Sequence, residues 1–309
     1  MAREELDAAG RVADKDEARQ RRVAALSYLG RALRGQGRPR EAAQAFAEAE
    51  AVLAEVSPHL PTLLGLAGFD YAQLLLEQAR TPVERYAVLE RARAALAVAE
   101  SIGHLLSIAL DHCTIGQALA GPDGSAAGSD GEAREAGAAL DLAIATMRRA
   151  SKMEFMPILY LTRAHHRRTQ CDPSGARADL ESALAIATPP GMRTYLAEAA
   201  LLAGQLALDL ALDPAQAGAA PDPAAPDPVP EAARHWTQAN RLIRETGYGR
   251  REAELHLLEA RLKHHQSRPF DAHAAQARAE SRLRTLGQWG LWPQLVQVAT
   301  ELGLPDRRL

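Results

Sequence analysis

Two groups of residues have the types that catalysis or metal binding requires. Asp111-His112-Cys113 places a carboxylate, a base and a thiol side by side, but consecutive residues of a helix point in different directions. A thiol nucleophile would need its base from another element, so we expect Cys113 to be a small buried residue. His165-His166 and His264-His265 diverge in the same way, and neither H-x-x-x-H nor C-x-x-C occurs.

The sequence also lacks motifs for nucleotide phosphate binding and for acyl transfer. The pattern G-x-x-x-x-G-K-[ST], whose backbone would hold the phosphates of a nucleotide, is missing from the sequence, as is a serine nucleophile elbow. We therefore expect a protein that is not an enzyme and that uses neither a metal ion nor another cofactor. The next question is which elements the sequence builds and what surface they present.

The composition favours packed helices. Hydrophobic residues make up 47% of the 309 residues and aromatic residues only 4%, whereas a β-sandwich would need more aromatic and β-branched residues. The formal net charge is −3, so nucleic acid is not the expected partner. Two short basic runs, around Arg21-Arg22 and Arg250-Arg251, are offset by nearby glutamates. Arginine far outnumbers the three lysines, which is typical of a GC-rich bacterial genome.

The expected compartment is the cytoplasm. Cys113 and Cys171 allow at most one disulfide, which favours a reducing environment. The N-terminal residues are charged and lack the apolar core of a signal peptide. The longest apolar run, near 196–212, is interrupted by Glu198, Gln205 and Asp209, so no segment is expected to span a membrane.

Helical patterns come in pairs, and a proline starts most of the second helices. Proline is tolerated in the first turn of a helix, and Thr81 with Glu84 can add a capping box beside Pro82. These prolines are Pro39, Pro82, Pro173, Pro230 and Pro269. The expected pairs are 18–36 with 39–56, 60–79 with 83–102, 104–120 with 132–150, 153–169 with 173–188, 192–211 with 230–246, and 249–266 with 269–286. A last helix, 293–303, is expected to cap the array.

The expected organisation has three parts: a disordered or frayed N-terminus (1–17), a repeat array (18–286), and a capping helix with a tail (287–309). Two stretches within the array, 121–131 and 211–230, lack helical periodicity and are rich in Gly, Ala, Pro or Asp. We expect them to be flexible insertions between the two helices of a pair, where they leave the stacking of units intact.

Nearly the same six residues occur twice, YLGRAL at 28–33 and TIGQAL at 114–119. A glycine inside a helix costs stability relative to alanine, so its small size is expected to allow two helices to approach closely. The faces that would meet in the first pair are Leu26, Leu29, Gly30 and Leu33 on one helix and Ala42, Phe46 and Ala49 on the other. Over residues 23–56 this spacing resembles the tetratricopeptide repeat (TPR). The resemblance implies an all-α fold, a right-handed α-α superhelix of about six helical pairs.

Later units resemble the same repeat with longer connections. In the third, Ile115 and Gly116 take the Leu-Gly position, with Ala138, Leu142 and Ala145 on the second helix. In the fourth, Leu161 and Thr162 take it, with Ala176, Leu180 and Ala183 on the second helix. The phrases LDHCTIGQALAG, ARADLESALAIA and ANRLIRETGYGRREAEL are also similar to the C-terminal TPR regions of bacterial STAND-class signalling NTPases. That similarity implies a sensor or scaffold role without ATPase activity, because the nucleotide motif is missing.

The TPR resemblance implies that the first helices of the pairs line a concave face. The residue after each Leu-Gly pair is expected to point into that groove, with further polar residues one turn on. The expected partner-binding residues are Arg31, Arg34, Gln73, Gln117, Arg163, His166, Arg167, Gln205 and Lys263. Arginine and amide side chains suit the carbonyls and carboxylates of a peptide. The other interpretation is that they are ordinary solvated helix residues.

These features predict a non-catalytic scaffold or sensor that binds a protein or peptide in its concave groove, in bacterial signalling or regulation. Neither nucleic acid nor a membrane is an expected partner. The alternative is a structural self-assembly module that oligomerises through an apolar patch near Trp289 and Trp292. A nucleic-acid-binding or catalytic helical protein is a further alternative. The sequence leaves the partner and the oligomeric state open.

Overall fold

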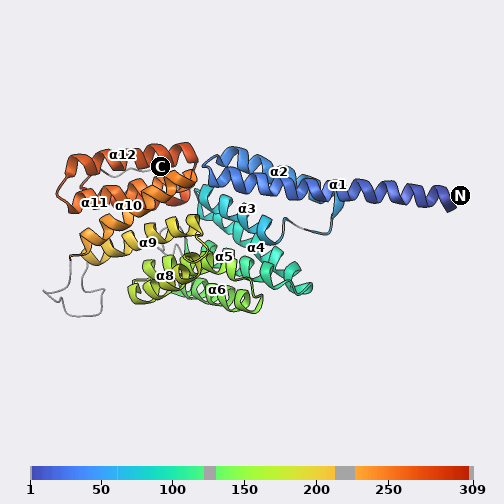
Figure 1. Cartoon of the computed structure of the whole chain (residues 1–309), viewed down its shortest axis with the longest axis horizontal. Coiled ribbons are helices and arrows are strands. Elements are labelled where there is room, and N and C mark those ends of the chain that lie inside the picture. The colour runs from blue at the N-terminus through green and yellow to red at the C-terminus, as the bar shows by residue number, and fades with distance from the viewer. Residues whose placement is uncertain (1, 61, 122–129, 213–226, 306–309) are drawn as a thin grey trace.

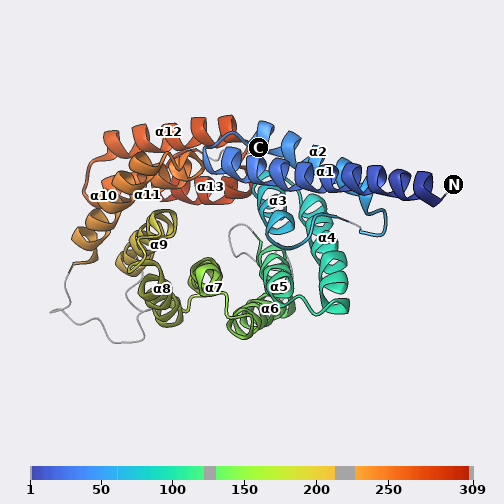
Figure 2. The ribbon, with the colours of Figure 1, turned by 45° about the vertical axis from the view of Figure 1, so that its right-hand side comes forward.

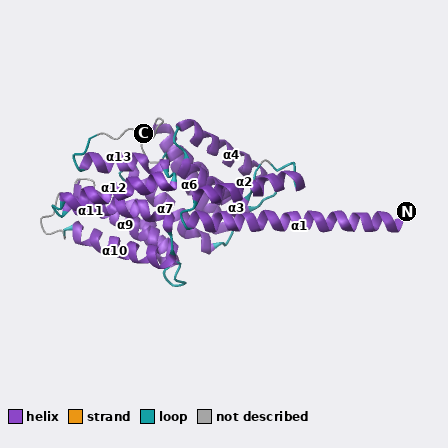
Figure 3. Cartoon of the chain, turned by 90° about the horizontal axis from the view of Figure 1, so that it is seen from above, coloured by secondary structure: helices purple, strands orange, loops and turns teal. Residues whose placement is uncertain are grey.

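The computed structural model describes residues 2–60, 62–121, 130–212 and 227–305, and in the first helix it describes side chains from Lys15 onward. Over these residues the chain forms α-helices and short 3₁₀ turns and no strand (Figure 3). The helices are α1 (Ala2–Gly35), α2 (Pro39–Val56), α3 (Gly65–Gln78), α4 (Pro82–Ser101), α5 (Leu105–Ala120), α6 (Asp130–Arg149), α7 (Met156–Thr169), α8 (Pro173–Ala187), α9 (Arg193–Leu212), α10 (Pro228–Thr246), α11 (Glu252–His265), α12 (Pro269–Leu286) and α13 (Trp292–Glu301).

Consecutive helices pack in pairs, as the sequence predicts. α1 packs on α2, α5 on α6, α7 on α8, α9 on α10 and α11 on α12. The second pair departs from this pattern, because α4 packs more extensively on α5 than on α3. Successive pairs stack into an α-solenoid, which confirms the predicted fold class. The solenoid curves until its last helices lie beside its first ones (Figures 1 and 2).

Local signals set most helix starts where the sequence places them. Proline occupies the first turn of α2, α4, α8 and α12. Thr81 and Glu84 form the expected capping box at α4. The helix α10 begins at Pro228 rather than Pro230, because the carboxylate of Asp227 accepts a hydrogen bond from the Val229 amide and starts the helix two residues earlier.

The N-terminal segment differs from the expectation of a frayed chain. Helix α1 begins at Ala2 and extends well beyond the end of its partner α2 (Figures 1 and 3). Its sequence is rich in Ala, Glu and Arg, which are good helix formers. The two expected insertions, 121–131 and 211–230, fall mostly on residues outside the described ranges.

The glycines inside the helices allow the close approach that the repeated hexapeptide predicts. A Cβ added at Gly30 would lie 2.9 Å from the ring of Phe46, and one at Gly116 would lie 2.7 Å from Leu140. At this spacing a methyl group would force the neighbouring side chain to move. The glycines therefore permit α1 to pack on α2 and α5 to pack on α6.

Two details of the predicted packing faces are wrong. The face of α6 that meets Gly116 carries Ala136, Leu140 and Ala143, which are buried, whereas the predicted Leu142 is 52% exposed. The predicted register of α6 is thus displaced by two residues, because the missing proline left its start undefined. Leu29 is 50% exposed, since no earlier unit covers the outer side of α1.

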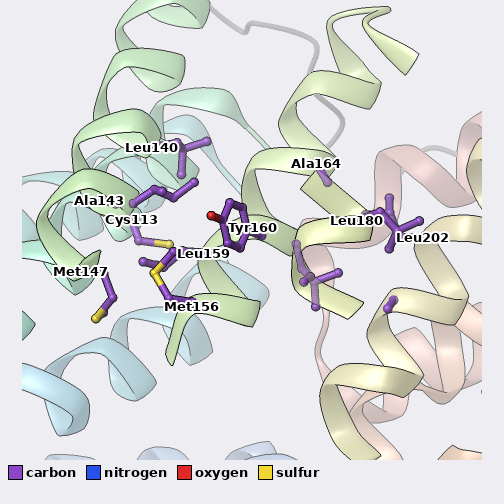
Figure 4. Close-up of a cluster of buried hydrophobic side chains, with 14 of the residues drawn as sticks. Cys113, Leu140, Ala143, Met147, Met156, Leu159, Tyr160, Ala164, Leu180 and Leu202 are labelled. Atoms are coloured by element: carbon purple, nitrogen blue, oxygen red, sulfur yellow. The ribbon is translucent and has the colours of Figure 1, made fainter. Parts of the chain in front are cut away.

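Small and aliphatic side chains build the core. The largest cluster joins α5 to α9 and includes Cys113, Leu140, Met156, Tyr160 and Leu202 (Figure 4). The predicted inward residues of α8, which are Ala176, Leu180 and Ala183, belong to it. Close helix contacts through alanine leave little space for aromatic residues, which accounts for their low frequency.

Helix α13 ends the array by packing on α11 and α12. Trp292 is only 3% exposed and lies in a cluster with Leu257, Leu283 and Leu295. The exposed apolar patch that the self-assembly alternative placed near Trp289 and Trp292 is therefore corrected: Trp292 packs inside the chain. The physical reason is that the last repeat has an apolar face, which the chain covers with its own C-terminal segment.

Candidate ligand-binding cavity

The first helices of successive pairs surround a cavity of about 760 Å³. Helix α7 lies in the middle of its wall and contributes Leu161, Thr162, His165, His166 and Thr169. These positions repeat every three or four residues, so they lie on one face of the helix. Helices α3, α5, α9 and α11 supply further wall residues.

The C-terminal segment forms the opposite wall and closes the ring. Residues Trp289–Leu291 lie against the end of α3, so tightly that a Cβ at Gly290 would be 2.9 Å from the Leu76 carbonyl oxygen. The guanidinium of Arg80 lies 4.2 Å from the ring centroid of Trp289. The cavity is thus bounded by both ends of the solenoid and opens to solvent.

We call this junction of the first and last units the seam, and define it by Arg34, Glu77, Glu198, Arg250 and Arg251. Arg34 donates to Glu77 at 2.7 Å, and Arg250 pairs with the same carboxylate from a position 173 residues away. Arg250 also pairs with Glu198 at 2.7 Å, and Arg251 does so at 3.0 Å. A continuous network of buried charges therefore joins α1, α3 and α9 to the turn before α11.

Electrostatics hold the seam in its charged form. Burial opposes ionisation of Glu77, but the guanidinium groups of Arg34 and Arg250 outweigh it and keep the pKa of Glu77 below its usual value. Burial also opposes ionisation of Glu198, but the guanidinium groups of Arg251 and Arg250 outweigh it and hold the pKa of Glu198 well below its usual range. Both carboxylates are therefore ionised at neutral pH, where each compensates a buried guanidinium.

A second network supports the wall on the far side of α7. Arg168 donates to Asp209 of α9, and Arg261 of α11 pairs with Asp209 at 2.9 Å. Arg261 also pairs with Glu301 of α13 at 2.9 Å. These ion pairs connect α7, α9, α11 and α13 in series. Ion pairs as well as apolar packing therefore stabilise the arrangement of the helices in this wall.

Four of the nine predicted groove residues line the cavity. Gln73 and Gln117 exchange hydrogen bonds through their carboxamides across α3 and α5. His166 is buried in the wall of α7, where burial lowers its pKa. Gln205 of α9 accepts from Arg168 at 3.3 Å. These side chains supply neutral polar groups to the cavity.

The other five predicted residues lie outside the cavity lining. Arg34 belongs to the seam, and Arg31 pairs with Asp70 at 3.4 Å on its outer side. Arg163 donates to Asp179 and Asp141, and Arg167 pairs with Asp179 at 3.0 Å. Lys263 lies over the ring of Trp236 at 5.8 Å.

The placement of Arg163 and Arg167 has a simple geometric reason. In α7 the cavity face carries Leu161 and Thr162 themselves, whereas Arg163 and Arg167 face the acidic Asp179 of the paired helix α8. The register assigned through Leu161-Thr162 is therefore displaced around the helix by about one residue, which corresponds to roughly 100°.

The sequence analysis did not identify the seam, nor the part of the cavity wall that Trp289 and Trp292 form. Glu198 and Asp209 carried a usable signal, because each interrupts an otherwise apolar stretch of α9 and a buried carboxylate requires a cationic partner. Arg250 and Arg251 were grouped with a nucleic-acid alternative as a short basic run. Their partner Glu77 lies too far away in the sequence for any local pattern to reveal the pairing.

Asp111, His112 and Cys113 lie on α5. Cys113 is buried, and burial raises the pKa of its thiol to about 12, so it is a poor nucleophile. Asp111 is buried, and burial raises its pKa to about 7. Within the described ranges, no group of three or more His, Cys, Asp or Glu side chains could hold a metal ion.

The comparisons with known proteins give a structural match. The crystal structure of a Rap protein complexed with competence and sporulation factor superposes with a TM-score of 0.56 and 12% sequence identity, over 91% of this chain and 76% of that chain. The two chains share a fold. No protein-family model and no curated protein sequence matches this chain.

Among the helices of the described segments, none combines the length and the apolar character that crossing a bilayer would need.

Proposed function

We propose that this chain is a non-catalytic binding scaffold that holds a short peptide, or a short segment of a protein, in this cavity. The observation that carries the proposal is the cavity of about 760 Å³ that the first helices and the C-terminal segment surround together. This volume falls within the range of sites that enclose one small ligand.

The chemistry of the walls supports a peptide. Apolar side chains such as Leu161, Leu201 and Leu202 alternate with the amides of Gln73, Gln117 and Gln205. Carboxamides can both donate to backbone carbonyls and accept from backbone N–H groups, and leucines can receive apolar side chains. The match to a Rap structure that was solved as a complex with competence and sporulation factor is consistent with a ligand-binding role for this fold.

The proposed setting is bacterial signalling or regulation. The similarity of several phrases to the C-terminal TPR regions of STAND-class NTPases motivates this setting, and it assigns the chain the part of a sensor. Occupancy of the cavity would then be the signal that a second protein reads.

The test is direct binding of synthetic pentapeptide pools, measured by thermal shift and confirmed by titration calorimetry. Gln205→Trp would fill the cavity from α9 and should abolish binding. Gln238→Trp, at an exposed position of α10, is the matched control and should leave binding intact. If Gln205→Trp folds and binds as the unaltered protein does, the ligand lies elsewhere and the proposal is wrong.

A further inference from the structure

The carboxylates that line the cavity already form ion pairs with arginines of the same chain. Glu77, Glu198 and Glu254 all line it, and each pairs with Arg250 or Arg251 in the same wall. The deep carboxylates therefore have guanidinium partners before any ligand arrives. Among the described residues, a charged side chain of a ligand would find no free counter-ion beside these carboxylates, and it would lose its hydration on entry.

The remaining polar wall is neutral. Gln73 and Gln117 satisfy each other, and Gln205 accepts from Arg168. Burial and the nearby guanidinium groups of Arg168 and Arg251 lower the pKa of His165 to about 3, so this imidazole is uncharged at neutral pH.

The apolar wall is contributed by two distant parts of the chain. Trp289, Leu291 and Trp292 line the cavity from the C-terminal segment, together with Leu161, Leu201 and Leu202 from α7 and α9. An apolar side chain between these surfaces would be removed from water on both sides, which favours its binding there.

Two cations remain at the rim. Arg80 is exposed and lies over Trp289, and Arg85 is half-buried near the start of α4. They lie at the solvent side of the cavity, where water can still hydrate a charged group. The charged ends of a ligand can therefore stay at the rim while its middle is enclosed.

From these contacts we infer that the cavity selects peptides whose enclosed part is uncharged and apolar, and that it discriminates against charged side chains. The selectivity comes from walls in which every deep charge already has a partner. This inference rests on the proposed function, because it names the class of peptide that the proposed site would take.

The experiment uses three pools of pentapeptides with acetylated and amidated ends, measured on the unaltered protein by titration calorimetry. One pool has only apolar and amide side chains, one has a central Asp or Glu, and one has a central Lys or Arg. The apolar pool should bind at least about tenfold more tightly than either charged pool, which corresponds to about 1.4 kcal/mol. A charged pool that binds as tightly as the apolar pool overturns the inference and leaves the proposed function standing. Failure of all three pools to bind contradicts both.

A charge-placement variant gives an independent measurement. Thr162→Glu adds a carboxylate to the cavity face of α7, and it should reverse the preference toward the basic pool by at least about tenfold. Thr237→Glu, at an exposed position of α10, is the matched control and should leave the preference unchanged. An unchanged preference in folded Thr162→Glu would show that the ligand does not lie against α7. If that variant does not fold, the three pools on the unaltered protein decide the matter.

Discussion

At the residue scale, Asp111 is a buried carboxyl group whose effect on folding stability can be measured through its pH dependence. It is 4% exposed, its Oδ2 atom has no hydrogen-bond partner among the residues that the structure describes, and burial raises its pKa from 3.8 to about 7. The folded state then holds a proton that the unfolded state has released between about pH 4 and pH 7. Stability should therefore fall as the pH rises through that interval and level off above it.

We predict that Asp111→Asn removes this loss and stabilises the protein at pH 8 by on the order of 2 kcal/mol. Urea unfolding at pH 5 and pH 8 checks it, because the difference between the two pH values should shrink in the variant. Glu154→Gln changes an exposed carboxylate and should leave the difference unchanged. A variant with the pH dependence of the unaltered protein would mean that Asp111 is hydrated or paired.

The glycines that allow close packing give a second residue-scale prediction. In Gly116→Ala the new methyl would lie 2.7 Å from Leu140 and 3.1 Å from the Ala136 carbonyl, so the variant should lose about 1–3 kcal/mol of stability. Gly35→Ala meets nothing within 4 Å and should be neutral or slightly stabilising. Thermal unfolding compares the two, and equal effects would contradict the packing argument.

At the element scale, the start of α4 is set by its own residues. The Thr81 side chain accepts from the Glu84 amide, and the Glu84 side chain accepts from the Thr81 amide. We expect Thr81→Ala to cost about 1 kcal/mol and to speed hydrogen exchange in the first turn of α4. The control is Arg38→Ala, because the side chain of Arg38 makes no capping bond at α2. Unchanged exchange in the α4 turn would show that tertiary packing, rather than the cap, fixes this start.

The elements also show why the register of a helix is harder to predict than its existence. α8 has Pro173 and a cap from Asp172, and its predicted inward face is buried as expected. α6 lacks the proline, and its predicted face is displaced by two residues. A local stop or start signal fixes register, whereas alanine-rich stretches offer several faces of nearly equal apolarity.

At the scale of the whole molecule, the seam holds the solenoid as a ring. Glu77→Gln removes the charge that Arg34 and Arg250 share, and the loss of one partner of a buried pair typically costs about 3–5 kcal/mol. We expect a lower Tm and a larger radius of gyration in small-angle X-ray scattering. Glu90→Gln, which affects the exposed pair with Arg93, should change neither. A destabilised variant of unaltered radius would show that other contacts close the ring.

The seam also predicts the response to acid. The pKa values of Glu77 and Glu198 lie below the ordinary value of 4.5, so their contribution to stability is complete above about pH 4.5. It is lost as the pH falls through that value toward the lower folded-state pKa. The acid loss of stability should be smaller in Glu77→Gln than in the unaltered protein, as unfolding at pH 3 and pH 6 would show.

The sequence by itself determined the helices, their pairing and the small residues at their crossings. The signals are local: prolines and caps at helix starts, apolar residues three or four apart, and glycine where Phe46 or Leu140 approaches. Each depends on residues of one helical pair, which is why the solenoid could be predicted, together with the cavity positions of Gln73 and Gln117.

Only the tertiary structure decided which side chains meet around the cavity. The small rotation between neighbouring units accumulates along the solenoid, and only the complete sum brings Arg250 to Glu77 and Trp289 to Arg80. The register of α7 directs Arg163 to Asp179 of the paired helix α8, and neutral amides remain in the cavity. No short pattern encodes the accumulated rotation, so the cavity between the two ends of the solenoid appears only once the whole chain has folded.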